Sequence, residues 1–246
     1  MAEKHFIITG TSRGIGEQLA MMLLERGSHV HGISRGSSDV LCKYKNYSHL
    51  KFDLSNTMGA QHMLDGILKS INTNDTDMLC LINNAAMLEP LKSIEKCTQE
   101  EINKNLQISL IAPMVLTSCF IQQTESLQLR RKIINISSGS GTYPAPDMSV
   151  YCTAKAGLNM FTRCVGAEQN KRENPIEIIA VDPGMVDTEL QRVARGKNET
   201  DFGMAPFFNA AHETGQLIST RDLGEHLLHR IDQKIEPGKI VTYAEV

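Results

Sequence analysis

A tyrosine and a lysine stand four residues apart in the stretch SVYCTAKAG, residues 149–157. Residues i and i+4 of a helix share one face, so Tyr151 and Lys155 would direct their head groups into the same space. A phenol can protonate a carbonyl oxygen while a hydride reaches the carbon. An ammonium about 6 Å away, at an effective dielectric near 20, would lower the phenol pKa by roughly 2 units. Taken alone, the pair is also consistent with an ordinary helix face.

Three glycines separate the first apolar run from the first amphipathic stretch, in the sequence TGTSRGIG. Gly10, Gly14 and Gly16 allow a tight turn, a close backbone approach and helix N–H groups directed at a pyrophosphate. The spacing differs from the usual G-x-G-x-x-G of dinucleotide sites. Taken alone, the glycines are also consistent with a structural turn. The position between strand and helix favours a dinucleotide-binding loop.

The end of the second apolar run distinguishes between two dinucleotides. An acidic residue there would bind the adenosine ribose of NAD, but this run ends in Ser34 and Arg35. Arg13 lies in the glycine loop. A 2′-phosphate attracts guanidinium groups, so the sequence predicts NADPH/NADP as cofactor, with solvated arginines as the alternative.

Apolar runs alternate with helical patterns along the whole chain. The alternation predicts an α/β fold: a Rossmann-type doubly wound parallel sheet of about seven strands with helices on both faces. We expect a single domain over 1–246, with a substrate-loop insertion at about 185–215 that is either a lid or a surface insertion. The expected strands are 5–10, 29–34, 49–54, 78–84, 132–138, 176–181 and 238–243.

The bulk composition excludes several function classes. A net charge of −3 gives no basic footprint for nucleic acid, and no run of about 18 apolar residues predicts a membrane span. The amino terminus lacks a signal-peptide pattern. The six cysteines form no C-x-x-C pair, so we expect reduced, mostly buried thiols in a cytoplasmic protein. Only His226 and His229 are close in sequence, and no metal site is predicted.

An ordered set of motifs resembles the short-chain dehydrogenase/reductase family. The set comprises the glycine loop, NNAA at 83–86, Asn105, Ser138 in INISS, Tyr151-x3-Lys155 and DPG at 182–184. The resemblance implies Tyr151 as proton donor, Lys155 as its tuning cation and a nicotinamide-ribose ligand, Ser138 as carbonyl-orienting hydroxyl, and Asn105 as holder of a relay water. It also implies these cofactor-binding residues: Gly10, Ser12, Arg13, Gly14, Ile15, Gly16, Ser34, Arg35, Asp53, Leu54, Asn84, Ala85, Tyr151, Lys155, Pro183, Gly184, Val186 and Thr188.

Within that family the chain is most similar to the sepiapterin-reductase-like branch. This resemblance implies NADPH-dependent reduction of one carbonyl of an aromatic or vicinal diketone to an α-hydroxy ketone. The expected pocket is built from residues 139–147 with Tyr143, from Met185, and from the 185–215 loop with Phe202, Phe207 and Phe208. A pterin diketone, a 3-oxoacyl thioester and a non-catalytic NADP sensor stay open as alternatives. We expect a homodimer through the helices that contain Asn105 and Tyr151.

Overall fold

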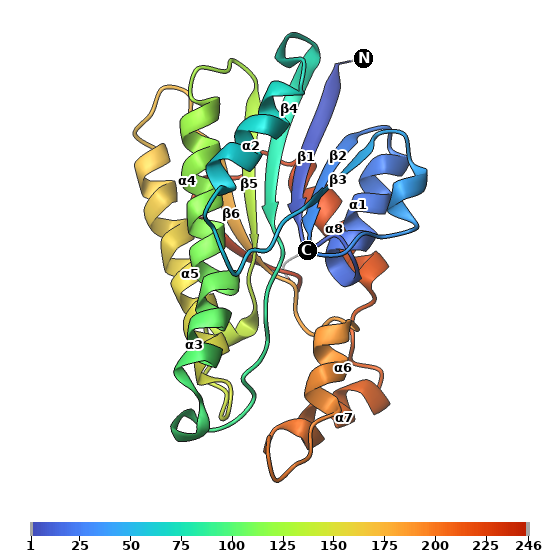
Figure 1. Ribbon diagram of the computed structural model, residues 1–246, viewed down its shortest axis with the longest axis vertical. Helices are drawn as coiled ribbons and strands as arrows, with labels where there is room; N and C mark the ends of the chain where they lie inside the picture. Colours follow the sequence, from blue (N-terminus) through green and yellow to red (C-terminus); the bar gives the residue numbers. More distant parts are fainter. Residues whose placement is uncertain (1, 245–246) are drawn as a thin grey trace.

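Seven parallel strands form one sheet in the order β3-β2-β1-β4-β5-β6-β7 (Figure 1). The computed structural model describes residues 2–244. The order reverses between β1 and β4, which is where doubly wound sheets bind ligands. The strands are β1 (Glu3–Thr9), β2 (His29–Ser34), β3 (Tyr47–Lys51), β4 (Thr76–Asn83), β5 (Arg130–Ile136), β6 (Glu177–Asp182) and β7 (Ile240–Thr242).

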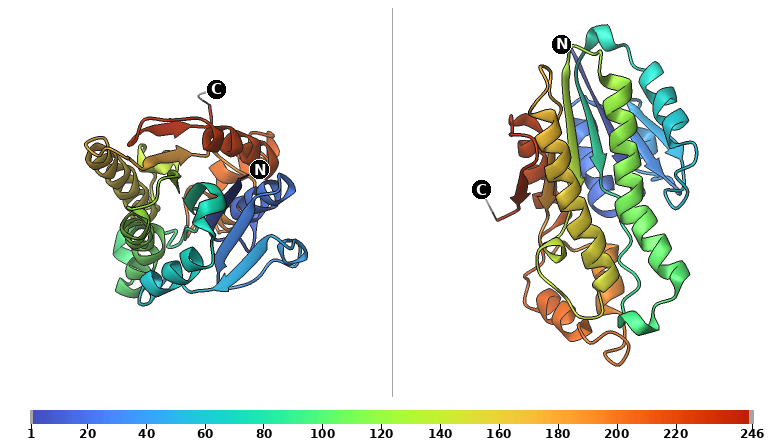
Figure 2. Two further views of the ribbon diagram at one scale, coloured as in Figure 1. Left: turned by 90° about the horizontal axis from the view of Figure 1, so that it is seen from above. Right: turned by 90° about the vertical axis from the view of Figure 1, so that its left-hand side faces the viewer.

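Helices cover both faces of the sheet, as the alternating pattern predicts (Figure 2). One face packs against α1 (Gly14–Glu25) and α8 (Thr220–Asp232), which contact each other across it. The other packs against α2 (Ala60–Lys69), α4 (Ala112–Thr124) and α5 (Ser149–Gln169). Central strands are apolar on both sides because each side contacts helices: Met78, Cys80 and Ile82 face α1 and α8, and Leu79 and Leu81 face the other layer.

The 185–215 segment is less irregular than its sequence suggests. It contains α6 (Glu189–Arg195) and α7 (Ala205–Glu213), which project below the sheet in Figure 1. Val186 before these helices and Ile218 after them form an isolated parallel β-bridge outside the seven strands. We call residues 187–217 the cap.

One helical stretch, Gln99–Thr124, passes a length and hydropathy test for a membrane span, with 44% of its most apolar window buried. It joins α3 (Gln99–Leu106), a π-helical turn (Gln107–Ile111) and α4. Leu116 and Phe120 are fully buried against the sheet, so the apolar character belongs to the protein core.

All six cysteines are free, as predicted, but the prediction that most are buried is wrong. Cys80 and Cys119 are buried, whereas Cys97 and Cys152 are half-buried and Cys42 and Cys164 are exposed. Cys164 lies on α5 beyond the buried stripe that faces the sheet. The apolar residues around each cysteine therefore predicted its burial correctly only for Cys80 on β4 and Cys119 on α4.

Candidate active site

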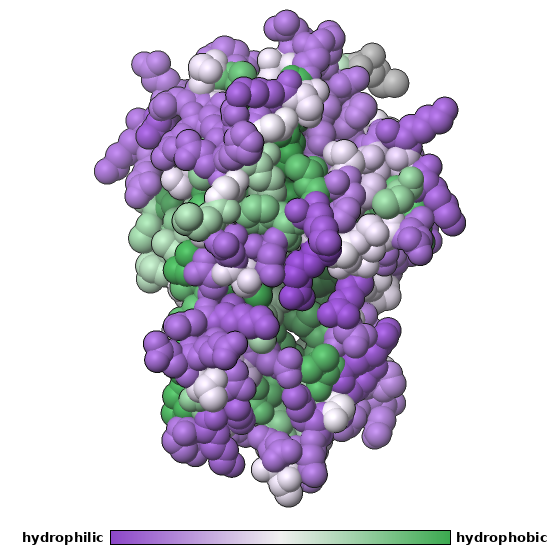
Figure 3. Space-filling model, viewed as in Figure 1, coloured by the Kyte–Doolittle hydropathy of each residue, from purple (hydrophilic) through white to green (hydrophobic). Residues whose placement is uncertain are grey.

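A cavity of about 1160 Å³ opens at the carboxyl ends of the strands. It runs from the glycine loop, past the end of β5, to the cap. In Figure 3 an opening lies between the sheet body and the cap, with apolar side chains in its depth and polar side chains around it. Every cofactor-binding residue predicted from the sequence lines this cavity except Gly16, which lies directly beneath the glycine loop.

The glycine loop needs glycine for two separate reasons. Gly10 and Gly14 have φ of 75° and 65°, in the left-handed region that strains other residues. Gly16 is limited by space, since a Cβ there would lie 2.3 Å from the Gly10 carbonyl oxygen and 2.5 Å from Asn84 Nδ2. The first turn of α1 therefore packs directly under the loop. Its unpaired N–H groups are of the type that binds a pyrophosphate.

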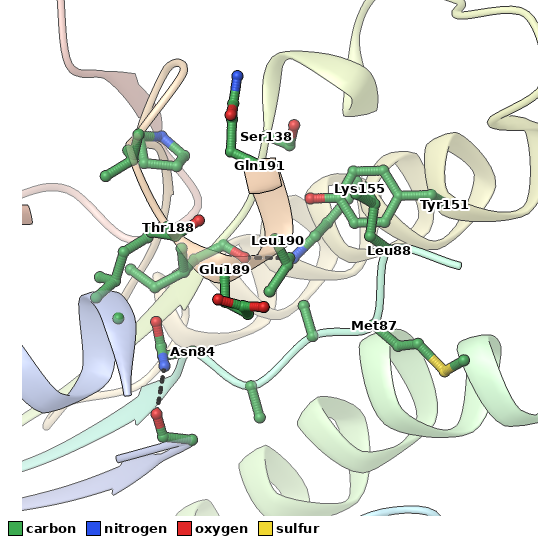
Figure 4. A pocket seen from close by; sticks show the side chains of 18 of the residues that line it. Asn84, Met87, Leu88, Ser138, Tyr151, Lys155, Thr188, Glu189, Leu190 and Gln191 are labelled. Atoms are coloured by element: carbon green, nitrogen blue, oxygen red, sulfur yellow. Dashed lines mark hydrogen bonds between the residues drawn. The ribbon is translucent and has the colours of Figure 1, made fainter. Parts of the chain in front are cut away.

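Asn84 and Ala85 tie the end of β4 to the glycine loop. The Asn84 amide donates hydrogen bonds to the Thr9 and Gly10 carbonyl oxygens at 2.9 and 3.3 Å (Figure 4). The backbone N–H groups of Asn84 and Ala85 both donate to Thr9 Oγ1, at 2.9 and 3.0 Å. This network fixes the two strands on either side of the switch point.

The far end of the cavity carries two exposed guanidinium groups. Arg13 and Arg35 line it, while the buried Ser34 hydroxyl donates to the Gly36 carbonyl oxygen at 2.7 Å. Asp53 lines the same end, and its carboxylate accepts from the Ser55 N–H at 2.9 Å. That hydrogen bond lowers the pKa of Asp53, with a smaller contribution from Arg35. The two guanidinium groups, Arg13 and Arg35, suit an adenosine moiety that carries a phosphate.

The predicted reactive side chains meet at the middle of the cavity. Tyr151 and Lys155 come from α5, and Ser138 follows β5 (Figure 4). Lys155 Nζ lies 5.6 Å from the centre of the Tyr151 ring and donates to the Ile136 carbonyl oxygen at 2.8 Å. Ser138 lies close enough to the Tyr151 phenol to lower its pKa. The four-residue spacing therefore brings the pair into one space, as the sequence predicted.

The electrostatics differ from the expectation of a lowered tyrosine pKa. Burial raises the pKa of Tyr151 to about 12, the Ser138 hydrogen bond opposes this rise, and Asp182 adds to it. Burial also lowers the pKa of Lys155 to about 8, and Asp182 opposes that change. The expected decrease rested on the charge of Lys155 alone, whereas burial of the phenol is the largest effect on its pKa. Tyr151 is consequently a protonated phenol at neutral pH.

Asn105 lies behind the cavity wall instead of lining it. Its side chain is fully buried, and Nδ2 donates to the Met87 and Glu89 carbonyl oxygens, both at 2.7 Å. Among the described residues its Oδ1 has no hydrogen-bond partner. The π-helical turn begins two residues later. The structure thus gives Asn105 a role in holding the loop after β4, and the predicted relay water stays a prediction.

Residues of the 185–215 segment line the cavity, as expected, and the structure shows which ones they are. Glu189, Leu190, Gln191 and Val193 of α6 face the cavity, together with Met87, Leu88 and Met148 from outside the cap. The sequence held a signal for α6. Helices favour a threonine before the first turn, an acidic residue in the first turn and basic residues in the last turn, and here these are Thr188, Glu189, Arg192 and Arg195.

Of the aromatic residues expected in the pocket, three line it and one does not. Tyr143, Phe207 and Phe208 line the cavity, as does Met185. Phe202 is fully buried and packs beside Phe208 at 5.8 Å between ring centres. Its expected contact with substrate is therefore wrong, because the cap uses this ring as its own core.

Comparison with known proteins defines the class. The family model for short chain dehydrogenase matches residues 4–199, and the chain belongs to the short-chain dehydrogenase/reductase family. It is an oxidoreductase that acts on CH–OH and C=O groups.

Two curated relatives are similar over nearly the full length. The chain is 35% identical to a benzil reductase ((S)-benzoin forming) of Bacillus subtilis (strain 168), with 98% of each chain covered. It is 36% identical to a benzil reductase ((S)-benzoin forming) of Bacillus cereus, covering 98% of this chain and 100% of that protein. The solved structure of ElxO with NADP bound has the same fold, with a TM-score of 0.77 and 21% identity over 98% of this chain and 96% of that chain.

Proposed function

We propose that this protein is an NADPH-dependent carbonyl reductase that reduces one carbonyl of an aromatic or vicinal diketone to an α-hydroxy ketone. The observation that carries the proposal is one continuous cavity. It joins the glycine loop, the Tyr151–Lys155–Ser138 group and an apolar cap. The names of the two bacillar relatives support the diketone substrate.

The bound cofactor supplies the hydride that reaches the carbonyl carbon. Tyr151 supplies the proton to the carbonyl oxygen, and its raised pKa keeps the phenol protonated until that step. Ser138 lies beside the phenol and can donate its hydroxyl to the same oxygen. Lys155 remains largely charged at neutral pH and stabilises the phenolate that forms after proton transfer.

The predicted preference for NADPH is supported by the charges around the adenosine end of the cavity. Arg13 and Arg35 are exposed there and are available to bind a 2′-phosphate bidentately. No acidic side chain ends β2, where a carboxylate would favour NAD. Asp53 lies at this end of the cavity as well, and one of its carboxylate oxygens already accepts the Ser55 N–H.

An apolar, flat substrate matches the side of the cavity that faces the cap. Leu88, Met148, Leu190, Val193 and Phe208 line it and offer contacts to aryl rings. Among the described residues that line this side of the cavity, there is no cluster of basic residues of the kind that would receive a carrier-bound thioester.

The proposal is tested by NADPH oxidation with a panel of carbonyls. We expect turnover of benzil and 1-phenyl-1,2-propanedione with NADPH, and much slower turnover with NADH. Sepiapterin and an acetoacetyl thioester serve as the competing substrates. Faster turnover of either competitor than of the diketones would overturn the substrate class, and no turnover by a sample that binds NADPH would overturn the enzymatic role.

We also propose a homodimer in the cytoplasm. The helices α4 and α5 lie side by side on the outer surface (Figure 2). Two apolar side chains are exposed there: Ile111, at the end of the π-helical turn before α4, is 38% exposed, and Met160 of α5 is 56% exposed. Burying them against a second copy is favourable. The free cysteines suit a reducing compartment. Sedimentation velocity of the wild type and Met160→Lys tests the dimer, because a charge in that interface should give a monomer.

A further inference from the structure

Glu3, His5, His29 and His31 gather at the amino ends of β1 and β2. Residues two apart on a strand share one face, and His5 is the register partner of His29. All four side chains therefore extend from the same face of the sheet. The group lies at the end of the strands opposite the cap, near the amino terminus in Figure 1.

Three of these side chains place possible ligand atoms together. Glu3 Oε2 lies 3.1 Å from His5 Nε2, and Glu3 Oε1 lies 3.6 Å from His29 Nε2. One ligand atom from each of the three lies within 4.8 Å of the others. Ligands of a tetrahedral zinc ion are about 3.3–3.4 Å apart, given metal–ligand bonds near 2.0–2.1 Å. The His5 and His29 rings stack with their centres 4.6 Å apart and their planes 16° apart, so the half-buried His29 ring would turn to direct its Nε2 at the same ion as His5.

A second row of contacts orients the inner histidine. His5 Nδ1 lies 3.3 Å from His31 Nε2, and His31 Nδ1 lies 2.8 Å from the Ser48 hydroxyl of β3. When His5 Nε2 carries the proton, it donates to Glu3, and His5 Nδ1 accepts a hydrogen bond from His31 Nε2. When His5 Nε2 binds a cation, the proton moves to His5 Nδ1, which donates to His31 Nε2. His31 Nδ1 then donates to the Ser48 hydroxyl. Such a supporting hydrogen bond accompanies most histidine metal ligands.

We propose that Glu3, His5 and His29 bind one divalent transition-metal ion, with Zn²⁺ as the best-matched ion. Two imidazole nitrogens and one carboxylate oxygen are ligands that zinc prefers, with water in the fourth position. The side chains of Glu3 and His29 are 44% and 36% exposed, whereas that of His5 is 6% exposed. The ion would thus enter from solvent past Glu3 and His29 and bind Nε2 of the buried His5.

No sequence pattern indicated this site, because His29 is far from Glu3 and His5 along the chain. Glu3 and His5 are separated from His29 by the whole of α1, and only strand pairing brings them together. The bound ion would link β1 to β2 at the end distant from the reactive side chains. We therefore expect zinc to raise the melting temperature without changing the turnover number.

The test is calorimetric titration of Zn²⁺ into tag-free, chelator-treated full-length protein. We expect one ion per chain and a higher melting temperature with zinc. His29→Asn should weaken binding at least about tenfold, and Ser48→Ala by about tenfold, as loss of an outer contact usually does. His62→Asn, an exposed histidine on α2, is the matched control and should bind like the wild type. NADPH-dependent turnover should be unchanged in all variants.

Cobalt distinguishes this site from binding at the exposed thiols Cys42 and Cys164. A tetrahedral Co²⁺ spectrum without a thiolate charge-transfer band, lost in His29→Asn, supports the proposal. The proposal is overturned if the wild type binds no zinc. It is also overturned if His29→Asn binds as tightly as His62→Asn, or if a thiolate band appears.

Discussion

The cavity has two walls that are stabilised by different interactions, hydrogen bonds on one side and apolar packing on the other. The sheet-side wall is made of backbone and fixed polar contacts: the glycine loop, the Asn84 network and the Lys155 bond to the Ile136 carbonyl. The cap-side wall is a small apolar cluster of its own, with Leu88, Met148 and Phe202 at its centre. Under the proposed function, the first wall holds the cofactor and the second contacts the substrate.

A few polar contacts hold the cap to the sheet body. Lys197 forms an ion pair with Glu89 at 2.8 Å, and the Gly203 N–H donates to Asp147 at 3.1 Å. Asp147 itself has φ of 61°, an unfavourable value for a non-glycine residue. The exposed ion pair contributes little stability. We infer that changes on the sheet side act on cofactor binding and chemistry, and changes on the cap side act on substrate affinity.

The largest effect is expected at the side chain that both walls share. Tyr151→Phe removes the phenolic proton while keeping the ring in its buried position. We expect kcat to fall about 10²- to 10⁴-fold, as for loss of a general acid, with NADPH affinity within about twofold. Steady-state kinetics and fluorescence titration of NADPH measure the two quantities. Near-normal turnover would remove Tyr151 from the proposed mechanism.

Arg35→Ala tests the sheet-side wall alone. Loss of a charge-assisted contact to a 2′-phosphate costs about 1.5–3 kcal/mol, or roughly 10- to 100-fold in NADPH affinity. NADH affinity and the KM for the diketone should stay within about twofold. Titration of the two cofactors gives the ratio. Equal weakening of NADPH and NADH would mean that Arg35 does not contact the phosphate.

Phe208→Ala tests the cap-side wall alone. The ring lines the cavity and packs edge-on against Phe207 at 5.6 Å. Removing it should raise the KM for benzil about tenfold, because part of the apolar contact is lost, with the KM for NADPH unchanged. Phe161→Ala is the control, because this ring on α5 packs against the core under α2, α4 and α5. It should lower the melting temperature without affecting the KM for benzil or for NADPH. A raised KM for NADPH in Phe208→Ala would show that the walls are not independent.

The same division explains what the sequence made predictable. Strand positions and the cofactor wall follow from local rules. Buried parallel strands require apolar runs, and a loop around phosphates requires glycine at Gly10 and Gly14. The four-residue spacing of Tyr151 and Lys155 likewise fixes their common face. These features are confirmed in the structure with few differences.

Features that depend on long-range contacts were not predictable from the residues alone. Burial of the Tyr151 ring results from packing of the cap against α5, and it reverses the direction expected for the tyrosine pKa. The location of Phe202 in the cap interior depends on the packing of α6 and α7 around it, which brings together residues from separate parts of the chain. The clustering of His5 and His29 exists only once β1 and β2 are paired.

The smallest expected effect is at Asp182, where the two walls meet. Its carboxylate raises the pKa of both Tyr151 and Lys155, so Asp182→Asn should lower both values. Reduction requires a protonated tyrosine and a charged lysine. The alkaline limb of kcat/KM, set near pH 8 by Lys155, should therefore move to lower pH by about one unit or less.

The asparagine keeps the oxygen that accepts the Gly184 N–H at 3.0 Å, so the turn after β6 is preserved. Glu189→Gln is the matched control, because this carboxylate lines the same cavity and is not among the causes of either shift. Profiles of kcat/KM against pH for both variants provide the comparison. A shift to higher pH in Asp182→Asn, or an equal shift in the control, would contradict the prediction. A shift confined to Asp182→Asn would mean that the sheet-side wall sets the charge state of the reactive pair while the cap sets its burial.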